Sequence, residues 1–386
     1  MRILLTGVTG LVGSCLAPLL QENNEVLCLI RPDRQKDAHA RLVETLPFSK
    51  KNIMAINGDV TLPKAGMKSA DIDRWKGKID KIVHGAASIR FDEPLSDETK
   101  RVNVGGTQTM LDLARELEVK EFHFLSTVYV AGSARSFTEN DFDVGQTTRN
   151  AYEKSKLEAE RLVRNWNGGK FSVHRMSIVI GDATSGYVKE FNGYYGFFVG
   201  FWRLRNSLYE RWLTGGKDRL IRQGISFDEE GFLELPLSID CSPVSKLNLV
   251  NSNWLARILN KLISLSAANQ TFHLVHPSPP RVQWVIEVSL DYLKIRGIQY
   301  RDGNSAASQM LRRMQRALDR KINRYLPYVT HEPIFGRDNL LRTLGESYVS
   351  APAISESMLQ RMLDYAIKVN FGQKNKETSE SVRRIA

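Results

Sequence analysis

The sequence predicts an α/β fold of the Rossmann type: a doubly wound parallel sheet with a smaller, mainly helical C-terminal substrate region. Up to residue 180, short apolar runs alternate with helical patterns, as is typical of parallel strands joined by right-handed helical crossovers. The strand segments are almost continuously apolar, which indicates that helices cover both faces of the sheet. A glycine-rich turn directly follows the first strand segment.

The expected elements follow one another in a regular order. Strands are expected at 3–5, 26–30, 53–56, 81–83, 122–125 and 171–176, and helices at 11–21, 33–45, 98–116 and 150–166. After residue 181 this rhythm stops, and strand and helix patterns resume at 247–250, 253–263 and 271–275.

These patterns predict two regions. A Rossmann domain is expected over residues 1–185, with residues 240–280 returning to it. Residues 186–240 and 281–372 are expected to form the substrate-binding and helical C-terminal region, and residues 373–386 a disordered tail. The aromatic-rich segment 194–212 can serve as a lid, as a substrate pocket or as an ordinary core, and the sequence leaves these three uses open.

The composition is that of a globular chain with a basic excess. Of its 386 residues 42% are apolar, and the net charge is +11. The excess is concentrated between Lys294 and Arg324. A basic surface can bind nucleic acid, an anionic membrane surface or a phosphorylated small molecule. Because no nucleic-acid-binding motif accompanies the charge, we expect no nucleic-acid partner, while peripheral membrane contact stays open.

Cysteine usage and hydropathy indicate the cytoplasm. Cys15, Cys28 and Cys241 are scattered and form no CxxC pair, which argues against a disulfide framework and against a zinc site. No run reaches the ~18 apolar residues that a membrane-spanning helix needs. We therefore expect a cytoplasmic protein without a metal.

The glycine-rich turn predicts a dinucleotide site, because it lies between the first strand and the first helix. Gly7 allows the tight turn, Gly10 lets the backbone approach a pyrophosphate, and Gly13 lets the helix pack closely on the sheet. The N-terminus of the helix then offers N–H groups and a positive dipole to the phosphates. The turn residues expected to contact the cofactor are Thr6, Gly7, Thr9, Gly10, Leu11, Val12 and Gly13.

Residues after the next strands predict the choice of cofactor. An acidic residue at the end of the second strand would favour NAD, but Arg31 stands there. A guanidinium suits a ribose 2′-phosphate, so we expect NADPH in preference to NADH. Asp59 with Val60 is expected near the adenine. Small residues after the fourth strand, Ala86 and Ala87, would let the backbone lie against the cofactor.

The candidate catalytic residues follow the fifth strand. Tyr152 and Lys156 lie one turn apart on a predicted helix, and an ammonium beside the phenol is expected to lower its pKa. The phenol would then move a proton to or from a substrate oxygen. Thr127, or its neighbour Ser126, can bind the same oxygen, and Asn103 would help to position the network.

In these motifs the chain resembles the extended short-chain dehydrogenases/reductases. The matching pieces are residues 6–13, 58–60, 103–107, 126–130 and 152–156, in the order and spacing of that family. Within it the chain is most similar to the fatty acyl-CoA reductase and thioester reductase branch, the "male sterility" type, through residues 84–92, 124–130 and 174–182. Met176 departs from this pattern, since the branch usually has proline there.

The resemblance implies roles for particular residues. It makes Thr127 the catalytic hydroxyl residue, Tyr152 the acid–base residue and Lys156 its partner, and it adds cofactor contacts at Ser177 and Ile178. It further implies reduction of an acyl thioester by NADPH, with the acyl group on coenzyme A or on an acyl carrier protein, to an aldehyde or alcohol.

Two other functions share these motifs. One is oxidation or reduction of a free carbonyl or secondary alcohol on a steroid-like or other lipid-like substrate. The other is a regulator that binds NAD(P) without turnover, although the chain keeps both Tyr152 and Lys156. A sugar-nucleotide dehydratase is disfavoured, because that branch has an Asp-Glu pair where Val128 and Tyr129 stand here.

Overall fold

The computed structural model describes residues 1–47, 52–89, 96–242, 244–266, 268–300 and 309–373. Its contacts divide the chain into two compact units. The first, which we call the Rossmann unit, comprises residues 1–179, 248–279 and 331–353. The second, which we call the helical unit, comprises residues 180–247, 280–330 and 354–386. Most of the expected disordered tail, residues 374–386, lies outside the described residues.

Several segments lie in a different unit from the one expected. Residues 180–185 and 241–247 were expected in the Rossmann domain, but they belong to the helical unit. Residues 331–353 were expected in the C-terminal region, but they belong to the Rossmann unit. Strand β16 (Ile334–Phe335) pairs with β6 (Ser136–Phe137) there. Helix α13 (Asp338–Leu344) contacts strand β13 of the main sheet. The sequence pattern missed this return because β16 is only two residues long.

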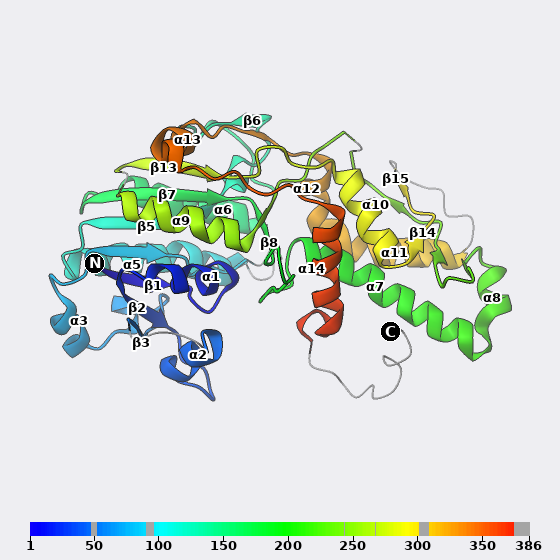
Figure 1. Cartoon of the computed structure of the whole chain (residues 1–386), viewed down its shortest axis with the longest axis horizontal. Coiled ribbons are helices and arrows are strands. Elements are labelled where there is room, and N and C mark those ends of the chain that lie inside the picture. The colour runs from blue at the N-terminus through cyan, green and yellow to red at the C-terminus, as the bar shows by residue number, and fades with distance from the viewer. Residues whose placement is uncertain (48–51, 90–95, 243, 267, 301–308, 374–386) are drawn as a thin grey trace. The chain divides into compact units, whose positions relative to one another are not determined.

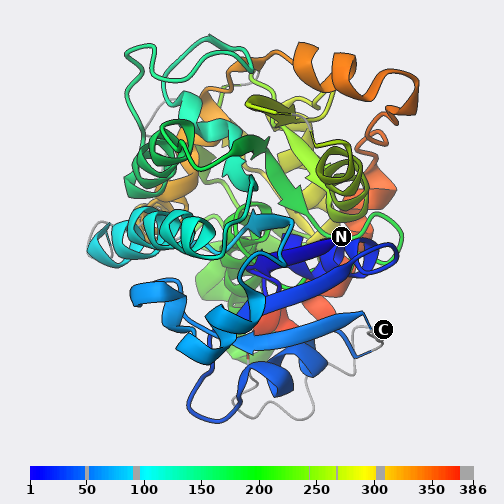
Figure 2. The ribbon, with the colours of Figure 1, turned by 90° about the vertical axis from the view of Figure 1, so that its left-hand side faces the viewer.

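The Rossmann unit is built on a parallel sheet, which confirms the predicted fold class (Figures 1 and 2). In the described residues its strands are β1 (Arg2–Thr6), β2 (Glu25–Ile30), β3 (Ile53–Asn57), β4 (Lys81–His84), β5 (Glu121–Thr127), β7 (Lys170–Met176) and β13 (Gln270–Leu274). Their order is β13-β7-β5-β4-β1-β2-β3. The chain winds outward from β1 to β3 and then returns to place β4 on the other side of β1. This reversal creates a topological switch point, where open α/β sheets bind ligands.

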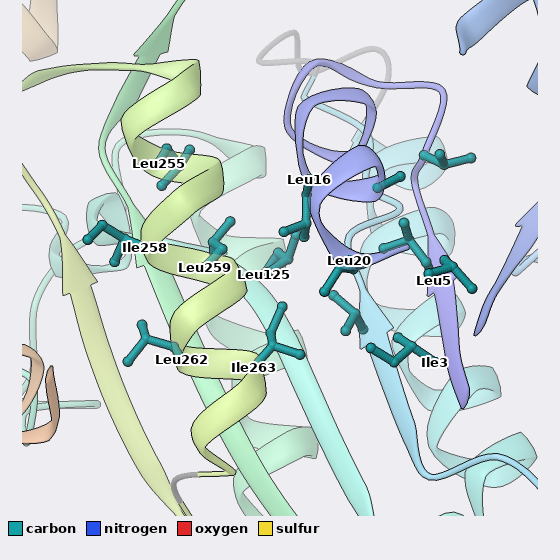
Figure 3. Packing of buried hydrophobic residues seen from close by; sticks show 14 of the residues in the cluster. Ile3, Leu5, Leu16, Leu20, Leu125, Leu255, Ile258, Leu259, Leu262 and Ile263 are labelled. Atoms are coloured by element: carbon teal, nitrogen blue, oxygen red, sulfur yellow. The ribbon is translucent and has the colours of Figure 1, made fainter. Parts of the chain in front are cut away.

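Helices cover both faces of the sheet, as the apolar strands predicted. One face is covered by α1 (Leu11–Leu20), α2 (Ala38–Thr45), α9 (Ser252–Leu265) and α13. The other is covered by α3 (Ser69–Trp75), α5 (Gly106–Glu116) and α6 (Ala151–Arg164). Figure 3 shows the first of these cores, in which Leu16 and Leu20 of α1 face Leu259 and Ile263 of α9.

Two of the expected helices differ from their predicted bounds. Helix α2 begins at Ala38 rather than at 33, because the Asp33 carboxylate accepts hydrogen bonds from the N–H groups of Gln35 and Lys36 in a turn. Asp37 then caps the helix at Ala40 N. The helix expected at 98–116 is divided into α4 (Ser96–Lys100), a π-helical turn over Arg101–Gly105, and α5.

The helical unit contains α7 (Tyr194–Arg211), α8 (Lys217–Ile221), α10 (Val282–Tyr292), α11 (Gln309–Ile322), α12 (Leu326–Thr330) and α14 (Glu356–Lys368). It also has short strands: β9 (Ser226–Phe227), β10 (Leu233–Glu234), β11 (Ser238–Ile239), β14 (Ile295–Arg296) and β15 (Gln299–Tyr300). The aromatic residues of α7 form a core, since Tyr194, Phe198 and Phe201 are buried and the Tyr194 hydroxyl is 2.9 Å from the Ser289 hydroxyl. None of the described helices is long and apolar enough to cross a membrane.

The α1–α9 core gives a stability prediction. Leu259→Ala removes a side chain with no exposed surface, and a buried Leu→Ala change leaves a cavity and costs about 2–5 kcal/mol. Val43→Ala is the control, because Val43 is 48% exposed and surface changes shift stability by only about 0.5 kcal/mol. Chemical denaturation measures both free energies of unfolding. Equal values for the two variants would contradict the packing described.

Candidate functional site

The glycine turn joins β1 to α1 at the switch point and depends on glycine at two positions. Gly7 has φ +80°, and a Cβ there would lie 2.6 Å from the carbonyl carbon of Gly85. A Cβ on Gly13 would lie 2.2 Å from the Gly7 oxygen. Helix α1 begins at Leu11, preceded by Gly10 in extended backbone and without a side-chain cap. The first N–H groups of α1 therefore stand at the C-terminal end of β1, where an anion can bind.

Thr6 ties this turn to the loop after β4. Its hydroxyl accepts hydrogen bonds from Gly85 N and Ala86 N, both at 3.1 Å, and lies 2.8 Å from Nδ1 of His84. Burial, and next the charge of Lys156, lowers the pKa of His84 to about 3. His84 is therefore neutral and serves this hydrogen bond. Ala87 follows and is exposed, so the predicted loop residues lie together beside the glycine turn.

The expected adenosine-binding residues lie at the ends of β2 and β3. The Arg31 side chain is 64% exposed, and its guanidinium lies 4.0 Å from the Asp59 carboxylate. The other oxygen of that carboxylate accepts from the N–H and hydroxyl of Thr61. Arg41 donates to the Arg31 carbonyl, which brings a second guanidinium to the same place. Val60, next to Asp59, is buried.

The three candidate catalytic residues come together at the C-terminal end of β5. The Thr127 hydroxyl lies near enough to the Tyr152 phenol to act on its pKa, which it lowers. The Thr127 hydroxyl also donates to Met176 O at 3.2 Å and accepts from Tyr129 N at 3.3 Å. One turn along α6, Lys156 Nζ donates to Leu125 O at 2.7 Å. The sequence therefore predicted correctly that the end of strand β5 and helix α6 lie beside each other.

The electrostatics of this group correct one expectation. Lys156 was expected to lower the pKa of Tyr152. Instead, burial and then the charge of Glu153 raise it, and only the hydrogen bond to Thr127 opposes the rise. Burial also lowers the pKa of Lys156 to about 7, against the charge of Glu160. The ammonium is engaged by the Leu125 carbonyl and lies 4.0 Å above the Phe124 ring. Tyr152 is therefore a protonated phenol at neutral pH.

Asn103 contacts the helix that carries the candidate catalytic residues, through main-chain contacts with Ser88 and one side-chain contact with Ser155. It lies in the π-helical turn, a type of irregularity that is frequent at functional sites. Its amide donates to Ser88 O at 2.9 Å and to Ser155 Oγ at 2.8 Å, and accepts from Ser88 N at 2.7 Å. Ser155 in turn donates to Tyr152 O. Asn103 thereby links the loop after β4 to α6.

A buried ion-pair network holds the rest of α6. Glu160 pairs with Arg175 of β7 at 2.6 Å and with Arg164 at 2.8 Å. It also accepts from the Ser126 hydroxyl at 3.2 Å. Burial acts to raise the pKa of Glu160, but the two arginines lower it. These contacts join α6 to β5 and β7, so the three elements that carry or adjoin Thr127 and Tyr152 are held together.

Ser177 and Ile178 follow β7 at the same edge of the sheet. Strand β8 (Ile178–Ile180) pairs with β12 (Leu249–Asn251), and Ile178 N donates to Asn248 O. Ser177 N donates to Leu274 O, whereas the buried Ser177 hydroxyl has no partner among the described residues. An unpaired buried hydroxyl, the open N-terminus of α1 and the exposed Arg31 guanidinium all fit a dinucleotide along this edge.

Glu332 belongs to this edge and was missed by the sequence. It accepts hydrogen bonds from Asn248 N at 3.1 Å and from the Tyr129 hydroxyl at 3.4 Å. It thus joins the loop after β5 to the segment beside Ile178. Burial raises the pKa of Glu332 to about 8, against its hydrogen bonds and the charge of Arg149. No local pattern marks Glu332, because its partners are distant in sequence.

Comparisons with known proteins agree with this geometry. A model of the family described as "Male sterility protein" matches residues 5–211. The chain is 26% identical over 325 residues to one of the linear gramicidin synthase proteins of Brevibacillus parabrevis, covering 79% of this chain and 6% of that protein. It is 28% identical over 177 residues to fatty acyl-CoA reductase wat of Drosophila melanogaster, covering 42% and 34%.

A third relative and two solved structures extend the comparison. Isonitrile lipopeptide synthase of Streptomyces coeruleorubidus is 32% identical over 206 residues, covering 49% of this chain and 14% of that protein. The chain therefore spans only a small part of the synthases that it matches. The fold is similar to that of the terminal R domain of the myxalamid PKS-NRPS pathway, with TM-score 0.71, 21% identity and coverage of 96% and 91%. It is also similar to a thiolation-reductase di-domain from an archaeal non-ribosomal peptide synthetase, with TM-score 0.67, 18% identity and coverage of 96% and 76%.

The raised pKa of Glu332 predicts a pH dependence of stability. In the folded chain the Glu332 carboxyl keeps its proton up to about pH 8, whereas an unfolded glutamate loses its proton at about pH 4. Stability contributed by the neutral carboxyl is therefore lost as the pH rises through this window. The melting temperature of the wild type, relative to Glu332→Gln, should fall between about pH 5 and pH 8. The exposed Glu229, changed to Gln, is the control. If the difference in melting temperature between the wild type and Glu332→Gln did not change with pH over this range, Glu332 would be ionised throughout it.

Proposed function

This chain belongs to the male sterility protein family and is an NAD(P)-dependent oxidoreductase of the extended short-chain dehydrogenase/reductase type; from that premise we propose that it reduces an acyl thioester with NADPH. The observation that carries the proposal is that the Thr127 hydroxyl lies beside the Tyr152 phenol at the C-terminal end of β5. A carbonyl oxygen placed between them can accept from both once the Thr127 hydroxyl turns from Met176 O. The matched fatty acyl-CoA reductase and the reductase domains of synthases support a thioester as the group that bears it.

The chemistry follows from the protonation state of Tyr152. When bound, NADPH supplies a hydride to the carbonyl carbon of the substrate. Tyr152 and Thr127 stabilise the developing oxyanion by donating hydrogen bonds. Because the pKa of Tyr152 is raised, its phenol holds the proton that the oxyanion takes to become a hemithioacetal. Cleavage of the C–S bond then releases an aldehyde, and the proton of the hemithioacetal hydroxyl passes to the departing sulfur, which leaves as the free thiol. A second hydride and proton would give the alcohol.

The remaining site residues would bind and orient the cofactor. The N-terminus of α1, at Leu11 and Val12, would hold the pyrophosphate. Arg31 would pair with the ribose 2′-phosphate and so favour NADPH. Ser177 and Ile178 would contact the nicotinamide, since the Ser177 hydroxyl is buried without a partner among the described residues. Lys156 would hold the nicotinamide ribose in exchange for the Leu125 carbonyl.

The proposed acyl donor is a carrier-bound thioester, with coenzyme A as the second form. One structural neighbour joins a reductase to a thiolation domain, and two of the matched proteins are synthases of which this chain covers 6% and 14%. The test is NADPH oxidation by purified protein with decanoyl-CoA, decanoyl-N-acetylcysteamine, decanal and a ketone. Turnover of the thioesters, with aldehyde or alcohol formed, would support the proposal. Turnover of only the aldehyde or the ketone would instead make the protein a carbonyl reductase.

Tyr152→Phe removes the proton donor while keeping the ring. We expect a loss of kcat of about 10²–10⁴-fold, the usual contribution of a general acid, with the Kd of NADPH unchanged. Tyr187→Phe is the control, because Tyr187 is 44% exposed. Steady-state kinetics and NADPH titration measure the two quantities. Wild-type kcat in Tyr152→Phe would exclude Tyr152 as the acid.

Arg31→Ala tests the choice of cofactor. Hydrogen bonds to charged groups contribute about 1.5–3 kcal/mol, so the KM for NADPH should rise about tenfold or more. The KM for NADH should change little, because NADH lacks the 2′-phosphate. Arg135→Ala, at another exposed arginine, controls for the lost charge. An unchanged ratio of the two KM values would show that Arg31 does not select the cofactor.

A further inference from the structure

Helix α11 carries much of the basic excess of the chain and is fixed in the helical unit by one face. Leu311, Leu318 and Ile322 are buried, with at most 4% of each side chain exposed. Gln315 adds a polar anchor, donating to Ser238 O at 2.8 Å and accepting from Ser238 N at 2.9 Å. The helix contacts α7. Its orientation within the unit is thus set by packing.

The opposite face presents a strip of arginines. Arg312, Arg313, Arg316 and Arg320 are all exposed; we call them the arginine strip. At about 100° per residue their Cα positions fall within an arc of about 100° of the helix, away from the buried face. Asp319 is the acid of this helix, and it lies outside the strip with its carboxylate accepting from Gln315 at 2.7 Å.

Three of the four arginines of the strip are not neutralised within the part of the chain that the structure describes. Arg313, Arg316 and Arg320 form no ion pair with any described acidic side chain. Like charges three and four residues apart on a helix repel one another and destabilise it. A fold that keeps several of them together on a fixed surface creates a local positive potential that can steer an acidic partner.

We propose that the arginine strip docks the acidic face of a carrier protein that delivers the thioester. This inference rests on the proposed function, because that function requires a carrier-bound acyl group. Complementary charge is the argument for this partner. A membrane surface fits less well, because helices that lie in a bilayer bury their apolar face in the lipid, and here Leu311, Leu318 and Ile322 are already buried in the protein. Docking through the strip would lower KM for the carrier-bound substrate without touching the chemistry.

The experiment compares two substrates and two variants of the full chain. The substrates are a decanoyl thioester on an acidic acyl carrier protein and the uncharged decanoyl-N-acetylcysteamine. The first variant is Arg313→Glu with Arg316→Glu and Arg320→Glu. The second, with the same net charge, changes Lys68, Lys120 and Arg135 to Glu, all exposed in the Rossmann unit. A triple Arg→Gln strip variant is included in case charge reversal disturbs folding, which thermal melting detects.

We expect KM for the carrier-bound substrate to rise at least about tenfold in the strip variant, with smaller effects for Arg→Gln and in the control. KM for the small thioester should stay unchanged. Added salt should raise the KM of the wild type for the carrier-bound substrate towards the KM of the strip variant. Equal KM values in all proteins would overturn the inference. So would strip-dependent binding to phosphatidylserine vesicles or to DNA with unaltered carrier kinetics. If the wild type reduces neither thioester, the proposed function itself is wrong.

Discussion

The contact between the Gly7 turn and the loop at Gly85 is the constraint on which the site depends. Gly7 packs so closely against Gly85 that no side chain fits between them, and the Thr6 hydroxyl binds the two N–H groups that follow β4. Strands β1 and β4 are neighbours only because the chain reverses its winding direction between them. The same contact therefore fixes the position of the glycine turn, where we propose that the cofactor binds.

Burial of polar groups sets the chemistry on the other wall. Lys156 and Glu160 point from one helix into the protein, and each is held by a specific partner, the Leu125 carbonyl and the Arg175 guanidinium. Such groups are costly to bury unless they are paired, so their pairing holds α6 in one position. With α6 in place, the Tyr152 phenol meets Thr127 and stays protonated. In the proposed reduction, this phenol gives its proton to the oxyanion.

Much of the fold and of the candidate site could be predicted from the sequence, because both rest on local patterns. Apolar runs located the strands of the sheet, and the spacing of Gly7, Gly10 and Gly13 located the turn between the first strand and the first helix. The pair Tyr152 and Lys156 was found because i and i+4 share a helix face. What escaped prediction depends on long-range packing. The return of residues 331–353 and the hydrogen bonds of Glu332 arise from neighbours that are distant in sequence. The raised pKa of Tyr152 arises first from burial, which depends on the whole fold.

Hydride transfer to the thioester is tested most directly with NADPH deuterated at C4 of the nicotinamide and a decanoyl thioester, followed by mass spectrometry of the product. We expect decanal with one deuterium at C1, or decanol with two, and release of the free thiol. Deuterium should be absent from C1 when Tyr152→Phe is used at equal protein concentration and short reaction time. Consumption of the thioester without deuterium at C1 in the wild type would contradict hydride transfer at this site.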